Sequence, residues 1–220
     1  MLRRAFRDPI TWAALVIDMI PFYAVLVLGW GATPLVFLYW FENIVIGVMT
    51  IARMIAAGIG KGGGGIAQIL FMVPFFTVHY GMFCLGHGIG LLMLQSDAFG
   101  GTSTAPSIEN FSGVVEQAQG SGSGMALFIM IIFAFNIFLF VWDYIGKRQF
   151  LDADPTEEMF APYGRIIILH IALFAGFFAL IHFGEPMLGV LALIVLRVIW
   201  GVVQSVARTI RLDQKVDAVS

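Results

Sequence analysis

The residues of this sequence with the most distinctive chemistry are histidines and carboxylates inside long apolar stretches. Residues 71–94 read FMVPFFTVHYGMFCLGHGIGLLML and contain His79 and His87. Ionisable groups are costly at membrane depth, so they are expected to face protein and to mark a site. Glu42 lies in a second apolar stretch and His182 near the end of a third. Imidazole and carboxylate groups together suit zinc, iron or manganese.

The composition places the chain in lipid, so a bilayer is its expected partner. Of the 220 residues, 60% are hydrophobic and only 12% are charged, whereas soluble domains carry about 25% charged residues. The sequence has no basic patch outside the helix flanks, which argues against nucleic acid as a partner. The single cysteine, Cys84, excludes an intrachain disulfide and a cysteine-rich metal site.

Six stretches are long enough to cross a bilayer, which takes about 20 apolar residues. We predict an all-α fold, a six-helix transmembrane bundle that forms a single membrane domain over residues 1–220. Small residues on several faces of the third helix, such as Gly81, Gly86 and Gly88, would place it at the bundle centre. The expected helices and the long outer loop cover residues 10–30, 35–57, 69–94, 125–146, 163–183 and 187–207, and residues 95–124.

Three local features refine this outline. Pro21 predicts a kink in the first helix. The glycine-rich residues 58–65 predict a flexible loop. Residues 147–162 are rich in acidic side chains and are expected to form a second loop on the same side of the membrane.

The basic residues predict the orientation of the chain. Lys and Arg flank both termini and the loops after the second and fourth helices, and the three opposite loops contain neither. Because cytoplasmic loops carry an excess of Lys and Arg, both termini are predicted to be cytoplasmic.

Depth follows from counting, since an α-helix rises 1.5 Å per residue. Glu42 and His87 both fall roughly 10 Å below the outer face. His182 lies on the same side, Asn43 adjoins Glu42, and Glu185 stands at the rim. A middle layer and an inner layer hold the remaining polar residues, namely Asp18, His79, Asn136 and Arg197, and then Arg53, Asp143 and His170.

The most specific hypothesis is a divalent metal, zinc first, held in the outer cluster by Glu42, His87 and His182. Two histidines and one carboxylate form an open ligand set for catalysis, so any reaction would be metal-assisted hydrolysis. Glu42 and His182 would be the catalytic groups, with His182 as a third ligand or a proton shuttle. His79 and His87 differ by about 12 Å in height, so they do not ligate one ion together.

The same groups suit two other functions, and the sequence leaves open whether the protein is an enzyme. Chains of acidic residues and histidines mark proton relays, as in a transporter or channel. The relay or ion-pair residues would be Asp18, His79, Asn136, Arg197, Asp143 and His170. Alternatively, the polar groups hydrogen-bond one another in a structural or accessory subunit without chemistry. A haem between His79 and His170 is a weaker hypothesis, and an oligomer is neither predicted nor excluded.

Two stretches, YWFEN at residues 39–43 and HYGMF at residues 79–83 with His87 and Gly88 behind it, are distinctive. They resemble a family of small prokaryotic integral membrane proteins of unknown function, over most of the membrane-embedded part. The resemblance implies a multi-pass protein of the bacterial or archaeal inner membrane, in which the Glu-Asn and His-His pairs recur. It brings no assigned activity and no catalytic residues.

Overall fold

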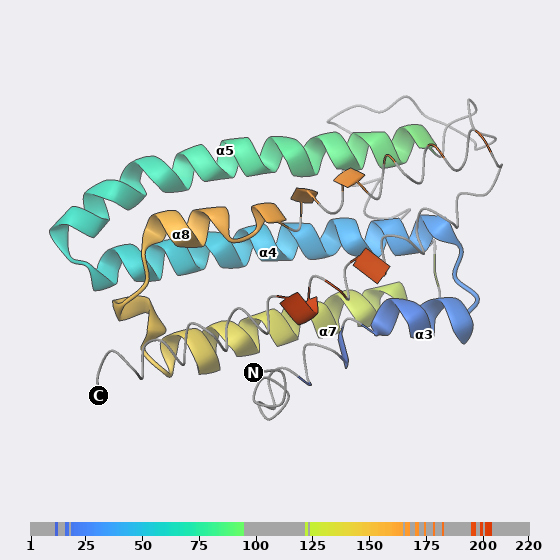
Figure 1. Ribbon diagram of the computed structural model, residues 1–220, viewed down its shortest axis with the longest axis horizontal. Helices are drawn as coiled ribbons and strands as arrows, with labels where there is room; N and C mark the ends of the chain where they lie inside the picture. Colours follow the sequence, from blue (N-terminus) through green and yellow to red (C-terminus); the bar gives the residue numbers. More distant parts are fainter. Residues whose placement is uncertain are drawn as a thin grey trace. The chain divides into compact units, whose positions relative to one another are not determined.

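The computed structural model describes two compact units, Met1–Ala32 with Ile167–Ser220 and Thr33–Ile166. Every regular element among the described residues is a helix (Figure 1), which confirms the predicted all-α class. The residues that the structure describes are 12, 16, 17, 19–94, 122, 124–164, 166, 167, 170, 171, 174, 178, 182, 195, 196, 199 and 201–203.

Three helices among the described residues are long and apolar enough to cross a membrane. Their candidate spans are Pro34–Gly60, Gly63–Ile89 and Met125–Ile145. These correspond to the second, third and fourth predicted helices. The fifth and sixth predicted helices and the outer loop at residues 95–124 lie largely outside the described residues, as does the beginning of the first predicted helix.

The second unit is built on a helical hairpin of α4 (Ala32–Gly60) and α5 (Gly63–Leu94), which run side by side in Figure 1. The predicted flexible loop at residues 58–65 is wrong, because the turn is confined to Lys61 and Gly62. A Cβ at Gly65 would lie 2.2 Å from the carbonyl oxygen of Gly58. The glycines therefore allow two helical backbones to meet closely, and this packing outweighs the low helix propensity of glycine.

Burial differs between the two helices of the hairpin. Half of the most apolar window of α4 is buried, against 17% of that of α5. Within the hairpin α4 is therefore the more buried helix, and the expectation that the third helix is central to the bundle stays a prediction. Gly81 and Gly86 of α5 have open space where a Cβ would be, so small residues on several faces do not imply neighbours on all of them.

The fourth predicted helix is present at residues 125–145, but it is made of two consecutive helix types. An α-helix, α7 (Met125–Phe138), passes into a π-helix, η3 (Leu139–Ile145). A π-helical turn inserts extra backbone into a helix and often occurs at functional sites. It places Asp143 and Tyr144 in buried positions at the end of this span.

The predicted loop at residues 147–162 is partly helical. It contains the 3₁₀ turn η4 (Gln149–Leu151) and the short helix α8 (Pro155–Phe160), with Asp154 capping the first turn of α8 through Thr156 N. Met159 of α8 packs with Met72 and Phe76 of α5 in a buried cluster. In Figure 1, α8 lies alongside the α4–α5 hairpin.

The first unit contains the helix α3 (Ile20–Leu26), in which Pro21 occupies the first turn. Proline suits that position because its missing N–H has no helical partner there. In place of the expected kink at Pro21, the chain turns at Met19 and a helix begins at Ile20. Isolated described residues of this unit between 167 and 203 are also helical.

Candidate functional site

The motif residue Trp40 joins α4 to α5. Its indole Nε1 donates a hydrogen bond to the carbonyl oxygen of Cys84 over 2.8 Å. A Cβ at Gly88 would lie 2.9 Å from Cζ2 of the same ring. Because Gly88 has no side chain, the indole lies against the backbone of α5 and reaches a carbonyl one turn away.

Tyr80 makes the reciprocal contact from α5 to α4. Its hydroxyl donates to the carbonyl oxygen of Asn43 over 3.0 Å in a buried position. A Cβ at Gly47 would lie 2.6 Å from Cε1 of the ring. We call Trp40, Gly47, Tyr80 and Gly88 the helix lock, because each aromatic donor fills the space over a glycine and bonds to the opposite backbone.

Glu42 belongs to a different face of α4. It is 5% exposed. It follows Trp40 by two residues, which places it about 200° around the helix. Glu42 is therefore turned away from α5 and takes no part in the helix lock.

His87 lies on the side of α5 that carries Tyr80, because seven residues make almost two full turns. The hydrogen bond of Tyr80 shows that this side faces α4. Among the described residues, no three His, Cys, Asp or Glu side chains are grouped closely enough to hold a metal ion.

The remaining predicted site residues are distributed over both units. His170 and His182 belong to the first unit, where His182 stacks on Phe178 at 4.0 Å and its Nδ1 lies 3.1 Å from the carbonyl oxygen of that residue. Asn136 donates to the carbonyl of Ile132 in its own helix. The expected positions of Asp18, Glu185 and Arg197 lie outside the described residues.

Asp143 and Arg53 form part of a polar group near the end of η3 and the last turns of α4. Asp143 is buried and pairs with Lys147 over 2.6 Å. The guanidinium of Arg53 lies 5.3 Å from the centre of the Tyr144 ring, and the Tyr144 hydroxyl donates to the Arg53 carbonyl over 3.3 Å. Tyr144 was not singled out from the sequence, where a tyrosine at the end of a span is typical of an interfacial anchor.

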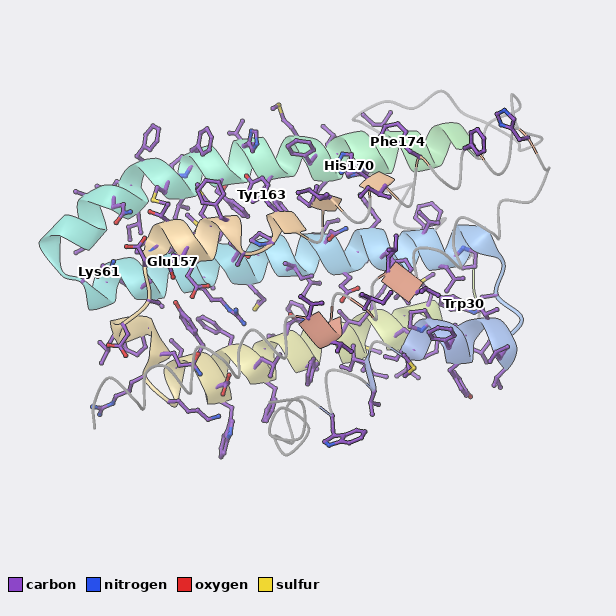
Figure 2. All side chains as sticks on the ribbon, viewed as in Figure 1. Trp30, Lys61, Glu157, Tyr163, His170 and Phe174 are labelled. Atoms are coloured by element: carbon purple, nitrogen blue, oxygen red, sulfur yellow. The ribbon has the colours of Figure 1, made fainter. Side chains whose placement is uncertain are left out.

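Beyond the ends of the spans, Lys61 pairs with Asp154. This hydrogen bond and one from Thr156 N lower the pKa of the Asp154 carboxyl from 3.8 to about 2. Gln68 of α5 donates to the Thr156 hydroxyl over 2.8 Å. Figure 2 shows Lys61 at the turn of the hairpin and Glu157 on α8. The acidic segment is thus held against α5 by specific contacts.

His79 lies in a different setting from its neighbour Tyr80. Its ring stacks on Phe75 at 5.4 Å, meets Phe83 edge-on at 5.2 Å and lies 6.0 Å from the ring of Tyr163. Both His79 and Tyr163 are half-buried. Within the described residues, the recorded contacts of these two side chains are with rings, not hydrogen bonds.

The fold and the apolar spans define a helical protein of the membrane class. The chain belongs to the family of unknown function DUF6498, whose sequence model matches residues 1–218. The predicted resemblance to a family of unknown function is thereby confirmed. No curated protein and no solved structure matches the chain.

Proposed function

We propose that the chain is a cation-coupled transporter or channel of the prokaryotic inner membrane, with six spans and both termini cytoplasmic. The apolar composition and the three candidate spans support the membrane location. The bias of Lys and Arg toward alternate loops supports the orientation. Reporter fusions after residues 62, 110, 148 and 220 test it, and the fusion at 110 alone should report the outer side.

The observation that carries this function is the burial of Glu42 on the face of α4 opposite the helix lock. A carboxylate held out of water either takes up a proton or pairs with a cation. Trp40 and Tyr80 already supply the contacts that hold α4 against α5. We therefore assign to Glu42 the exchange of a cation, and a proton is the first candidate.

A divalent metal, zinc first, is the second candidate for the same carboxylate. The observation that favours a metal is the burial of Glu42. The sequence predicts that His87 and His182 lie at a similar depth in the membrane. A site of this kind would use Glu42 and His182 as catalytic groups in metal-assisted hydrolysis.

The test compares Glu42→Gln with Glu157→Gln, which makes the same chemical change at an exposed glutamate of α8. Purified protein is reconstituted in liposomes that contain a pH-sensitive dye, and proton flux is followed after a pH jump. We expect proton flux in the wild type and in Glu157→Gln, and its loss in Glu42→Gln. The side-chain amide of the introduced Gln neither takes up nor releases a proton in the pH range of the experiment.

Elemental analysis of the same three proteins, purified without a metal-affinity column, separates the two candidates. Near-stoichiometric metal that is lost in Glu42→Gln would establish the metal site in place of the proton site. Equal flux in all three proteins, or neither flux nor metal in the wild type, would contradict the proposal. The latter result would favour a structural subunit.

A further inference from the structure

The helical backbone beside α5 is interrupted by a turn directly before residue 163, where the fifth predicted helix begins. The helix α8 ends at Phe160, Ala161 and Pro162 form a turn, and the chain is helical again at Tyr163. Proline ends the hydrogen-bonding pattern of the preceding helix because it has no N–H. In Figure 2, Tyr163 lies beside α5 just beyond the end of α8.

This interruption lies near the middle of the candidate span of α5. The ring of Tyr163 is 6.4 Å from Phe76 and 6.3 Å from Tyr80. Phe76 is the midpoint of the span Gly63–Ile89. Irregular backbone at membrane depth is tolerated where protein or a polar cavity covers it.

The side chains around the interruption form what we call the aromatic surface, made of Phe75, His79, Phe83 and Tyr163. The ring of Phe75 is largely exposed, and the other three are half-buried. His79 and Tyr163 bring an imidazole and a phenol hydroxyl to this surface, and the four residues include no acid, lysine or arginine. Polar hydrogens without an acceptor are costly in hydrocarbon.

We infer that the aromatic surface binds the ring of a lipid-soluble quinone from the bilayer. A quinone is flat, so it stacks on Phe75 and Phe83. It is uncharged, which suits a surface without a fixed charge. Its carbonyl oxygens accept hydrogen bonds from a neutral imidazole N–H and from a phenol O–H, which are the two donors that this surface offers.

The binding test uses the full-length protein in lipid nanodiscs and decylubiquinone as the probe, measured by isothermal titration calorimetry against empty nanodiscs. His79→Leu and Tyr163→Phe each remove one donor. We expect saturable binding to the wild type and an affinity about tenfold lower in each variant, in line with the loss of one hydrogen bond. Tyr80→Phe is the matched control, because it removes a hydroxyl that already bonds to Asn43, and it should bind as the wild type does.

Thermal unfolding of each variant establishes that the folded state survives, and Glu42→Gln separates this inference from the proposed function, because it should bind the quinone normally. Three results would overturn the inference: no saturable heat in the wild type, unchanged affinity in both His79→Leu and Tyr163→Phe, or equal binding of decylbenzene. The last result would mean that the surface holds an apolar chain without using its donors.

Discussion

His79 and Tyr80 are neighbours on α5, yet they belong to regions with opposite properties. Tyr80 is buried, packs over Gly47 and donates to a backbone oxygen of α4. His79 is half-buried and contacts other rings. The helix lock has satisfied its donors within the protein, whereas the aromatic surface presents donors to the surroundings. The difference teaches that polar residues in one apolar helix can serve packing on one face and binding on the next.

The largest effect is expected from Trp40→Ala, which tests how much the helix lock contributes to stability. It removes a buried indole and its bond to the Cys84 carbonyl, so the free energy of unfolding should fall by about 3–5 kcal/mol. Unfolding in mixed micelles measures it. Trp142→Ala is the control, because Trp142 is an exposed residue of η3. An equal loss in both variants would show that the helix lock has no special role in stability.

A smaller effect is expected from crowding the two faces of α5 separately. Gly88→Leu puts a side chain where the Trp40 ring lies, and overpacking of this kind costs about 1–3 kcal/mol. Gly81→Leu puts the same side chain where there is open space, and it should leave stability unchanged or raise it. The same unfolding measurement applies, and a loss in Gly81→Leu as large as that in Gly88→Leu would mean that both faces are packed.

The smallest effect is expected from the Lys61–Asp154 ion pair. It lies outside the membrane spans, where an ion pair contributes less to stability than the contacts of the helix lock or the aromatic surface. Asp154→Asn removes the partner of Lys61 but keeps a good N-cap for α8. Near neutral pH the wild type should be more stable by about 0.2–1 kcal/mol, as is usual for exposed pairs.

The pH dependence of this difference has a defined sign. The folded pKa of Asp154 is about 2, below its ordinary value of 3.8. The stabilisation is thus complete above about pH 4 and is lost as the pH falls toward 2. Unfolding curves of wild type and Asp154→Asn should therefore converge in acid. Glu157→Gln, an exposed change in the same helix, is the control, and a difference that persists in acid would contradict the assignment.

The sequence predicted the helical class and three of the membrane-capable helices well, because runs of apolar residues determine both. From the distinctive motifs the sequence predicted a site of ionisable groups, which stays a prediction. It gave no sign that Trp40 and Tyr80 of the same motifs bond to backbone oxygens. Such contacts depend on how α4 and α5 are rotated and staggered. Hydropathy and spacing along one helix do not contain that information.

Two local elements, the helical glycines at residues 63–65 and the π-helix η3, were not predicted from the sequence. Glycines at 63–65 predict a loop by propensity, but they are helical because Gly58 and Gly65 permit a close approach. The π-helical turns of η3 read LFVWDYI, which apart from Asp143 is an ordinary apolar run. At the glycines tertiary packing decides the backbone conformation.

The bond from Trp40 to residue 84 uses a main-chain oxygen, and this has a consequence for protein engineering and for evolution. The backbone carbonyl oxygen remains whatever side chain residue 84 carries, so Cys84 can be replaced by another small residue without loss of the hydrogen bond. Cys84→Ala would therefore yield a thiol-free protein with the helix lock intact. Such a variant would accept single spectroscopic labels at any chosen position.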